Sequence, residues 1–266
     1  MKKRIGFGTY SIRETSILKK CLKQAIECGY DFVDTAFIYG NEKEIGTALR
    51  ELEFEGYKKP IKIQTKIWPD FYDNVELAVY ASMQKLQVSK LDMCLLHRPN
   101  YDFNKSISAW KKLVKLYQKN LIAEIGVSNF DRDAIEIMYR ESGFYPQSNQ
   151  IELSVNNYRL DRVVYNNAKK IEVQAWSPLG DIENNLKDKL LIELAQKYNT
   201  DVAGICIAYL SSLNHSVIVK SANEQRIKSN YNGFQIIIEK DDIEKIKKLN
   251  TFKIKFSESY EYDVNQ

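Results

Sequence analysis

The sequence has few of the residues that metal and redox sites require. Its four cysteines include no C-x-x-C pair, which argues against a zinc ribbon and a thioredoxin-like redox motif. Its two histidines, His97 and His215, lie far apart, and neither has an acidic residue at ligand spacing. We therefore expect no bound metal, and we expect the cysteines to be reduced and mostly buried.

Long apolar runs and blocks of one charge are also missing. No segment approaches the roughly 18 consecutive apolar residues of a membrane helix, and the opening MKKR is followed by Ile5-Gly6-Phe7 rather than by a secretory apolar stretch. The net charge is +4, from 39 basic and 35 acidic residues, and the lysines are scattered. This distribution is typical of a solvated surface. We expect a cytoplasmic protein that binds neither membranes nor nucleic acids.

The chain does contain an alternation of short apolar or β-branched runs with longer amphipathic segments, which is the pattern of β-α-β units. No linker rich in Pro, Gly or Ser divides the 266 residues, so we predict a single domain over residues 1–266 with a short polar tail from about residue 251. The pattern predicts eight strands, at residues 4–9, 31–35, 61–66, 91–96, 122–127, 148–152, 171–176 and 216–220.

Helices are predicted between these strands, where apolar residues recur on one face. In the first helix the apolar face runs from Ile17 to Ile26, with Ser16 as the expected N-cap and Gly29 as the expected stop. Parallel strands joined in this way form an open doubly wound sheet or a closed barrel, and eight units favour a (β/α)₈ TIM barrel. The other helices are predicted at residues 45–52, 73–87, 105–118, 131–141, 161–169, 187–198, 202–213 and 241–249.

Four polar residues stand where the chemistry of such a barrel is found, at the carboxyl ends of strands. Asp34 lies at the carboxyl end of the second expected strand and Tyr39 follows that strand, Lys66 ends the third, and His97 follows the fourth. Each also has a structural interpretation, as a helix cap, a surface residue or a core histidine. Together they predict one rim on which a carboxylate, a phenol, an ammonium and an imidazole meet.

These residues and the motifs around them resemble the aldo-keto reductase family. The resemblance implies a (β/α)₈ barrel enzyme, an NAD(P)H-dependent oxidoreductase that acts on a small-molecule carbonyl substrate. The matching motifs, in chain order, are Gly6-Phe7-Gly8-Thr9-Tyr10, Asp34 to Glu42 with Ile45-Gly46, Lys66, Leu96-His97-Arg98-Pro99, Ile125-Gly126-Val127-Ser128-Asn129-Phe130, Asn149-Gln150-Ile151-Glu152, Ala175-Trp176-Ser177-Pro178-Leu179-Gly180, and Lys220-Ser221 with Arg226 and Asn230.

The resemblance implies a role for each of the four polar residues. Tyr39 is the general acid that protonates the carbonyl oxygen as hydride arrives from the nicotinamide. An isolated tyrosine has a pKa of about 10, and we expect the Lys66 ammonium to lower the pKa of Tyr39. Asp34 is expected to pair with Lys66 and keep it charged. A neutral His97 is expected to donate a hydrogen bond to the substrate oxygen.

The resemblance also implies bound NADPH or NADP⁺, with NADH as a possible alternative. Ser128, Asn129 and Gln150 would hold the carboxamide, and Trp176 would stack on the nicotinamide. Arg226 would bind the 2′-phosphate, which NADH lacks, with Lys220, Ser221 and Asn223 beside it and Asn230 near the adenine. The remaining expected cofactor contacts are Thr9, Tyr10, Asp34, Ser177, Pro178, Leu179 and Ala222.

The sequence departs from the family pattern at several positions. Trp176 stands where the family usually has Tyr, Ser229 where many members have an acid, and Val219 where a Pro usually precedes Lys220. The preference for NADPH over NADH is therefore less fixed than binding itself. The start at Met1 leaves no room for the hairpin that usually plugs the barrel floor, so helix packing or the chain's own side chains must cover it.

The substrate pocket is expected to be formed by Tyr10, Phe37, Trp68 and Arg98, which follow strand ends. Arg98 would attract a carboxylate or phosphate group, or form a salt bridge at the rim. We expect a monomer or a weak oligomer. An alternative function from another class is an NADP-binding sensor or regulatory subunit with little turnover.

Two further motifs have competing interpretations. Lys66 at a barrel strand end also fits a Schiff-base aldolase, although Tyr39 and Arg226 fit a reductase better. The Gly6-x-Gly8 pair lacks the third glycine of a dinucleotide-binding fingerprint, because Ser11 stands in its place. We interpret the two glycines as positions where the strand needs backbone clearance.

Overall fold

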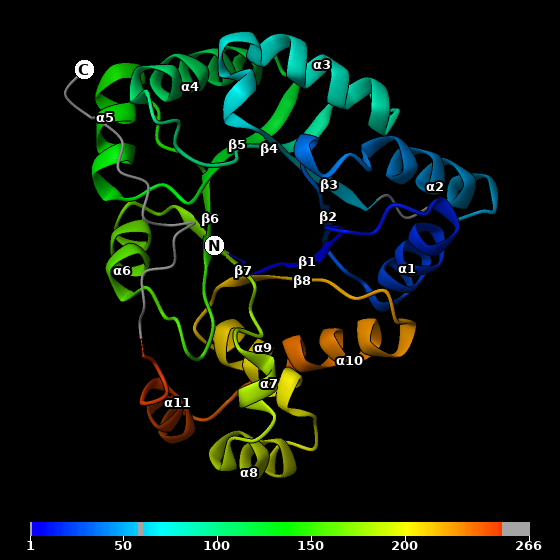
Figure 1. Cartoon of the computed structure of the whole chain (residues 1–266), viewed down its shortest axis with the longest axis vertical. Coiled ribbons are helices and arrows are strands. Elements are labelled where there is room, and N and C mark those ends of the chain that lie inside the picture. The colour runs from blue at the N-terminus through cyan, green and yellow to red at the C-terminus, as the bar shows by residue number, and fades with distance from the viewer. Residues whose placement is uncertain (1, 58–60, 252–266) are drawn as a thin grey trace.

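The strands of the protein form a closed barrel. The computed structural model describes residues 2–57 and 61–251. Within them, parallel strands pair in chain order from β1 to β8, and β8 pairs with β1. Figure 1 shows the strands as a central ring with the helices around it. The strands are β1 Ile5–Gly8, β2 Phe32–Asp34, β3 Lys62–Ile67, β4 Leu91–Leu96, β5 Ile122–Ser128, β6 Ser148–Glu152, β7 Glu172–Trp176 and β8 Ser216–Val219.

Helices connect the strands and cover the outside of the barrel, which is the (β/α)₈ TIM barrel that the sequence predicts. None of the described helices is long and apolar enough to cross a membrane. The helices are α1 Thr15–Cys28, η1 Phe37–Tyr39, α2 Glu42–Phe54, η2 Pro69–Asn74, α3 Val75–Leu86, α4 Phe103–Gln118, α5 Arg132–Ser142, α6 Leu160–Ala168, α7 Ile182–Asn185, α8 Lys189–Lys197, α9 Val202–Ser212, α10 Glu224–Gln235 and α11 Lys240–Lys247.

The strand predictions are confirmed, with each boundary within about one residue. The predicted stop of the first helix is also confirmed, because Gly29 ends α1 with a φ of 98°, a left-handed conformation that glycine adopts at little cost. The predicted N-cap is wrong. α1 begins at Thr15 after Glu14, so Ser16 lies inside its first turn. Of the predicted polar tail, Thr251 is described and residues 252–266 lie outside the described residues.

One long helix has no counterpart among the sequence predictions. α10 occupies a segment for which the sequence indicates only cofactor contacts. Its apolar face is narrow, with Ile227 and Phe234 buried among polar neighbours. A start signal is nevertheless present, because the Asn223 side chain accepts a hydrogen bond from the backbone N–H of Arg226 at 3.0 Å.

A small apolar cluster inside the barrel packs closely against a glycine of β1. Phe32, Met93 and Ile218 form a separate apolar cluster. A Cβ atom on Gly6 would lie 2.5 Å from Cζ of Phe32, so a larger residue on β1 there would displace the buried Phe32 ring. This requirement supports the interpretation of Gly6 as a clearance position.

Side chains of the chain itself contact one another at the amino-terminal end of the barrel. Arg4, directly before β1, forms an ion pair with Glu172 of β7 and another with Glu124 of β5, the latter at 3.0 Å. The Arg4 guanidinium lies 5.7 Å from the centre of the Phe32 ring. Among the described residues, only 2–4 precede β1, and no hairpin is formed there.

His215 is buried directly before β8 and has one polar side-chain contact. Its Nε2 lies 2.9 Å from the hydroxyl of Tyr158, and 1% of its surface is exposed. Burial lowers the pKa of His215 to about 4, well below the value of about 6.5 for an exposed histidine. The folded protein therefore holds this imidazole neutral where the unfolded chain binds a proton.

The depressed pKa of His215 predicts a loss of stability in acid. As the pH falls from about 6.5 to about 4, the unfolded state binds a proton that the folded state does not bind. The free energy of unfolding therefore falls by up to about 3 kcal/mol. A His215→Gln variant should escape this loss. Denaturant unfolding measured between pH 8 and pH 4 tests the prediction, and an equal decline in both proteins would contradict it.

Candidate active site

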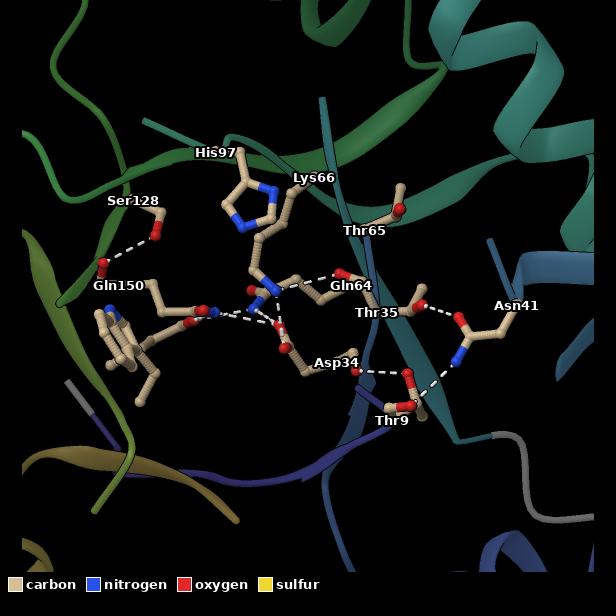
Figure 2. A network of polar contacts seen from close by, with 12 residues as sticks. Thr9, Asp34, Thr35, Asn41, Gln64, Thr65, Lys66, His97, Ser128 and Gln150 are labelled. Carbon is tan, nitrogen blue, oxygen red and sulfur yellow. Dashed lines mark hydrogen bonds and ion pairs between the residues drawn. The ribbon is translucent and has the colours of Figure 1, made fainter. Parts of the chain in front are cut away.

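Three of the four predicted catalytic residues occupy neighbouring strand ends. Asp34 is the last residue of β2, Lys66 lies one residue before the end of β3, and His97 follows β4 directly. Tyr39 joins them from η1, the short helix that follows β2. Figure 2 shows Asp34, Lys66 and His97 around one point of the barrel mouth. The predicted convergence at one rim is therefore observed.

Lys66 and Asp34 form an ion pair inside the barrel. Nζ of Lys66 lies 2.7 Å from Oδ2 of Asp34, and the two side chains are 0% and 5% exposed. Lys66 also donates to the carbonyl oxygen of Thr35 at 3.0 Å. Burial by itself would lower the pKa of Lys66, but the charge of Asp34 and the hydrogen bonds with Asp34 and Tyr39 outweigh it, so the pKa is raised. Lys66 is an ammonium at neutral pH.

Tyr39 lies against this ion pair and is protonated. The Lys66 ammonium lies 5.2 Å from the centre of its ring. Burial raises the pKa of Tyr39, and although the charge of Lys66 lowers it, burial dominates. The Lys66 charge acts on this pKa in the expected direction, but the net shift is upward, because the sequence cannot show how deeply the phenol is buried. The result is a phenol that retains its proton throughout the neutral range.

His97 contributes a neutral imidazole. Burial lowers the pKa of His97 well below its usual value, and the positive charges of Lys66 and Arg98 lower it further. Its ring contacts Tyr39 and Trp68 edge-on, with centroid distances of 5.9 and 5.1 Å. Its Nδ1 has no hydrogen-bond partner among the described residues. A protonated phenol and a neutral imidazole thus lie side by side, beside a fixed positive charge.

These groups adjoin a cavity of about 930 Å³ at the barrel mouth. Its lining also includes Gly8, Ser11, Arg13, Ile38, Ile218 and Val219, which sequence reasoning does not assign to the site. The predicted site residues that line it are Thr9, Tyr10, Asp34, Tyr39, Trp68, His97, Arg98, Ser128, Asn129, Gln150, Trp176, Ser177, Pro178, Leu179 and Lys220.

Phe37 does not line this cavity, contrary to the sequence prediction. Its ring packs on Phe71, with centroids 4.5 Å apart, and Nζ of Lys85 lies 3.9 Å from its centre. The next residue, Ile38, lines the cavity instead. Phe37 and Ile38 are consecutive in a tight helical turn, so their side chains point in different directions.

The residues expected to hold a carboxamide contact one another at one side of the cavity. Ser128 donates through Oγ to the carbonyl oxygen of Gln150 at 2.9 Å, and Asn129 has a left-handed φ of 65°. The indole Nε1 of Trp176 donates to Oδ1 of Asn129 at 2.9 Å. This contact fixes the large aromatic face of Trp176 at the cavity wall.

The residues expected to bind the 2′-phosphate lie farther along the chain. Lys220 lines the cavity, whereas the residues after it form the turn into α10 and do not. Arg226 is exposed in the first turn of α10, and Asn230 is buried on the inner face of the helix. The structure therefore places this group in continuity with the cavity rather than within it. The residues of the turn are Ser221, Ala222 and Asn223.

Sequence reasoning misses Asn41, which ties together the loops that carry the site. Its Oδ1 accepts a hydrogen bond from Oγ1 of Thr35, and its Nδ2 donates to the carbonyl oxygens of Thr9 and Ile12, all at 2.9 Å. Figure 2 shows Asn41 joined by dashed lines to both Thr9 and Thr35. The sequence signal for Asn41 is its place in the motif from Asp34 to Glu42, directly after Gly40, which has a left-handed φ of 68°.

Sequence reasoning also misses two glutamines below the catalytic group, Gln64 and Gln174, which are both buried. Their signal is the two-residue alternation of a strand: Gln64 precedes Lys66 by two positions and Gln174 precedes Trp176 by two, so each shares the inward face. No group of three His, Cys, Asp or Glu residues arranged to hold a metal ion occurs in residues 2–57 and 61–251.

Comparison with known proteins identifies the family. The sequence model of the Aldo/keto reductase family matches residues 4–251. Methylglyoxal reductase DkgA of Yersinia pestis is 34% identical over 253 residues, 94% of this chain and 90% of that protein. Glyoxal reductase of Bacillus subtilis is 31% identical over 92% of this chain and 88% of that protein. An aldo-keto reductase of Bombyx mori, solved in complex with NADP, superimposes with a TM-score of 0.88 at 27% identity, covering 97% of this chain and 93% of that one.

The low pKa of His97 predicts that this ring does not titrate in the neutral range. Because the protein has only two histidines, proton NMR can follow both Hε1 signals separately. Neither should show an inflection between pH 8 and pH 6, whereas both should titrate near 6.5 in the unfolded protein. A His97→Asn variant assigns the signals. An inflection of the His97 signal near pH 6.5 would contradict the prediction.

Proposed function

The chain belongs to the aldo/keto reductase family, and from this premise we propose that it uses NADPH to reduce an aldehyde or ketone to the corresponding alcohol. One observation carries the proposal: a protonated phenol, a neutral imidazole and a buried ammonium–carboxylate pair meet at a cavity of about 930 Å³. Hydride transfer to a carbonyl carbon leaves negative charge on its oxygen, and this group of side chains can neutralise that charge.

The residues present fit a nicotinamide nucleotide. When bound, NADPH supplies the hydride. Ser128, Asn129 and Gln150 offer hydroxyl and amide groups that suit a carboxamide, which needs both donors and acceptors. The fixed indole face of Trp176 suits stacking on a flat ring. Gly8 on the cavity wall leaves room for backbone approach.

Tyr39 supplies the proton. Its raised pKa keeps the hydroxyl protonated before the reaction, and the Lys66 charge 5.2 Å from its ring stabilises the phenolate that remains afterwards. His97, held neutral, donates a hydrogen bond to the same oxygen and orients the carbonyl. Asp34 keeps Lys66 in place through the ion pair of 2.7 Å.

The choice of NADPH over NADH rests on the turn after β8. Lys220, Ser221 and Asn223 lead to Arg226 at the start of α10, where backbone N–H groups and a guanidinium both favour a phosphate. Ala222 and Asn230 complete this part of the nucleotide site.

The substrate is proposed to be a small carbonyl compound held above the nicotinamide. Tyr10, Trp68 and Arg98 line the cavity around Tyr39 and His97. The Arg98 guanidinium stacks on the Trp68 ring, with 4.1 Å between its central carbon and the ring centre. Two relatives are named for the reduction of methylglyoxal and of glyoxal, which are small dicarbonyls. The acting unit is proposed to be one domain spanning residues 1–266.

A single-turnover experiment separates this function from that of an NADP-binding sensor. NADPH bound to the protein should be oxidised when a panel of aldehydes that includes methylglyoxal and glyoxal is added. NADPH that stays reduced with every carbonyl would favour the sensor.

Tyr39→Phe tests the general acid. The variant keeps the ring but lacks the proton, so carbonyl reduction should fall by about 10²–10⁴-fold while NADPH affinity stays within about two-fold. Steady-state kinetics and nucleotide fluorescence measure the two effects. Tyr80→Phe, on the exposed face of α3, is the control and should behave as wild type. Loss of NADPH binding in Tyr39→Phe would count against its assigned role.

Arg226→Ala tests the phosphate site. Loss of charge-assisted hydrogen bonds should weaken NADPH binding by about 10- to 100-fold and leave NADH binding within about two-fold. Lys228→Ala, exposed on the same helix, is the control for charge alone. Equal weakening of both nucleotides in Arg226→Ala would show that the 2′-phosphate is held elsewhere.

A further inference from the structure

Three buried glutamines lie beneath the catalytic carboxylate. Gln64 of β3 and Gln150 of β6 both donate through Nε2 to Oδ1 of Asp34, at 2.7 and 3.0 Å. Both also donate to Oε1 of Gln174 on β7, at 2.9 and 3.3 Å. Gln174 in turn donates through Nε2 to Glu172 at 3.3 Å. A chain of hydrogen bonds thus runs from the catalytic site to the barrel floor.

Asp34 and Glu172, the carboxylates at the two ends of this series of hydrogen bonds, fix the direction of each glutamine amide. A carboxylate only accepts hydrogen bonds, so Gln64 and Gln150 turn their nitrogen atoms toward Asp34 and Gln174 turns its nitrogen toward Glu172. A reversed amide would place an oxygen against a carboxylate in the barrel interior, where an unmade hydrogen bond is costly. Because Glu172 is held by its ion pair with Arg4, the barrel floor determines which way the amides point.

Gln64 and Gln150, the two donors to Asp34, differ in their exposure to the cavity. Gln150 lines the cavity, where the proposed function gives it the cofactor carboxamide to bind. Gln64 is fully buried and does not line the cavity. Its hydrogen bond of 2.7 Å to Asp34 is also the shorter of the two. Gln64 is therefore the donor that stays on Asp34 whatever Gln150 binds.

We propose that Gln64 is a positioning residue for the reduction. It occupies Oδ1 of Asp34, which leaves Oδ2 directed at Lys66 and so holds the ammonium beside Tyr39. Gln174, Glu172 and Arg4 keep the Gln64 amide in its working orientation. This inference rests on the proposed reductase function.

The test compares Gln64→Met, which keeps the volume but cannot donate, with Gln64→Glu. Gln64→Met should lower kcat by about ten-fold or more, as expected for loss of a hydrogen bond to a charged group, and change the NADPH dissociation constant by less than about two-fold. In Gln64→Glu the introduced carboxyl donates while protonated and repels Asp34 once ionised. Its kcat at pH 6 should lie within about three-fold of wild type and fall as the pH rises, through an inflection that wild type lacks.

Gln147→Met is the matched control for loss of a structural glutamine. Gln147, half-buried directly before β6, accepts a hydrogen bond from the backbone N–H of Ile125 at 2.8 Å and forms no hydrogen bond with Asp34 among the described residues. This variant should keep the wild-type kcat and pH profile even where its melting temperature falls. Wild-type kcat in Gln64→Met, or pH profiles that are alike in wild type and both Gln64 variants, would overturn the proposal.

A stability measurement tests the role of Gln64 without an activity assay. In a double-mutant cycle of Gln64→Met and Asp34→Asn, the effects on the urea midpoint should be non-additive, because Gln64 stabilises the carboxylate. Additive effects would overturn the proposal. If the wild-type protein reduced no carbonyl at all, the proposed function would fail, and this cycle would still decide whether Gln64 positions Asp34.

Discussion

The active site depends on keeping one ammonium and one carboxylate together in the interior of a barrel. Moving each ion out of water costs several kcal/mol, and a buried pair is tolerated only when its geometry is good and its remaining hydrogen-bonding positions are filled. Asp34 meets both conditions, because Lys66 occupies one carboxylate oxygen and two glutamines occupy the other. The positive charge of Lys66 opposes the effect of burial on the pKa of Tyr39 and adds to the effect of burial on the pKa of His97. Burial is the larger effect on both residues, and the ion pair sets the fixed positive charge beside them.

The fold could be predicted from the sequence because its elements repeat with clear periodicity. The strands alternate with amphipathic helices, and parallel pairing leaves few arrangements for eight such units. The missed element, α10, has a narrow apolar face, and most of its residues are polar, so its helical period is weak. The start of α1 was misplaced because Glu14, a poor N-cap, precedes the helix, while the better capping residue, Ser16, lies inside it. Tertiary packing decides such boundaries.

The site was predictable to the extent that position along a strand determines position in space. The rule that chemistry lies at strand ends, with the family motifs, identified the four residues that meet at the mouth. It could not decide between Phe37 and Ile38, since one residue of offset in a tight turn redirects the side chain. It also could not give the direction of the pKa shift of Tyr39, which depends on how far burial outweighs the Lys66 charge. The roles of Gln64 and Gln174 could not be predicted, because they depend on hydrogen-bond partners from strands distant in the sequence.

The polar core also limits how the barrel can be divided. A (β/α)₈ barrel can be divided into two half-barrels, which in this protein would be β1–β4 and β5–β8. In this protein hydrogen bonds cross that boundary from Gln64 to Gln174 and from Gln150 to Asp34, and Arg4 forms an ion pair with Glu172 below them. A chimaera that joins one half to the other half of a relative would therefore separate donors from acceptors in its buried interior. A working chimaera therefore requires that the polar residues on both sides of the boundary be exchanged together.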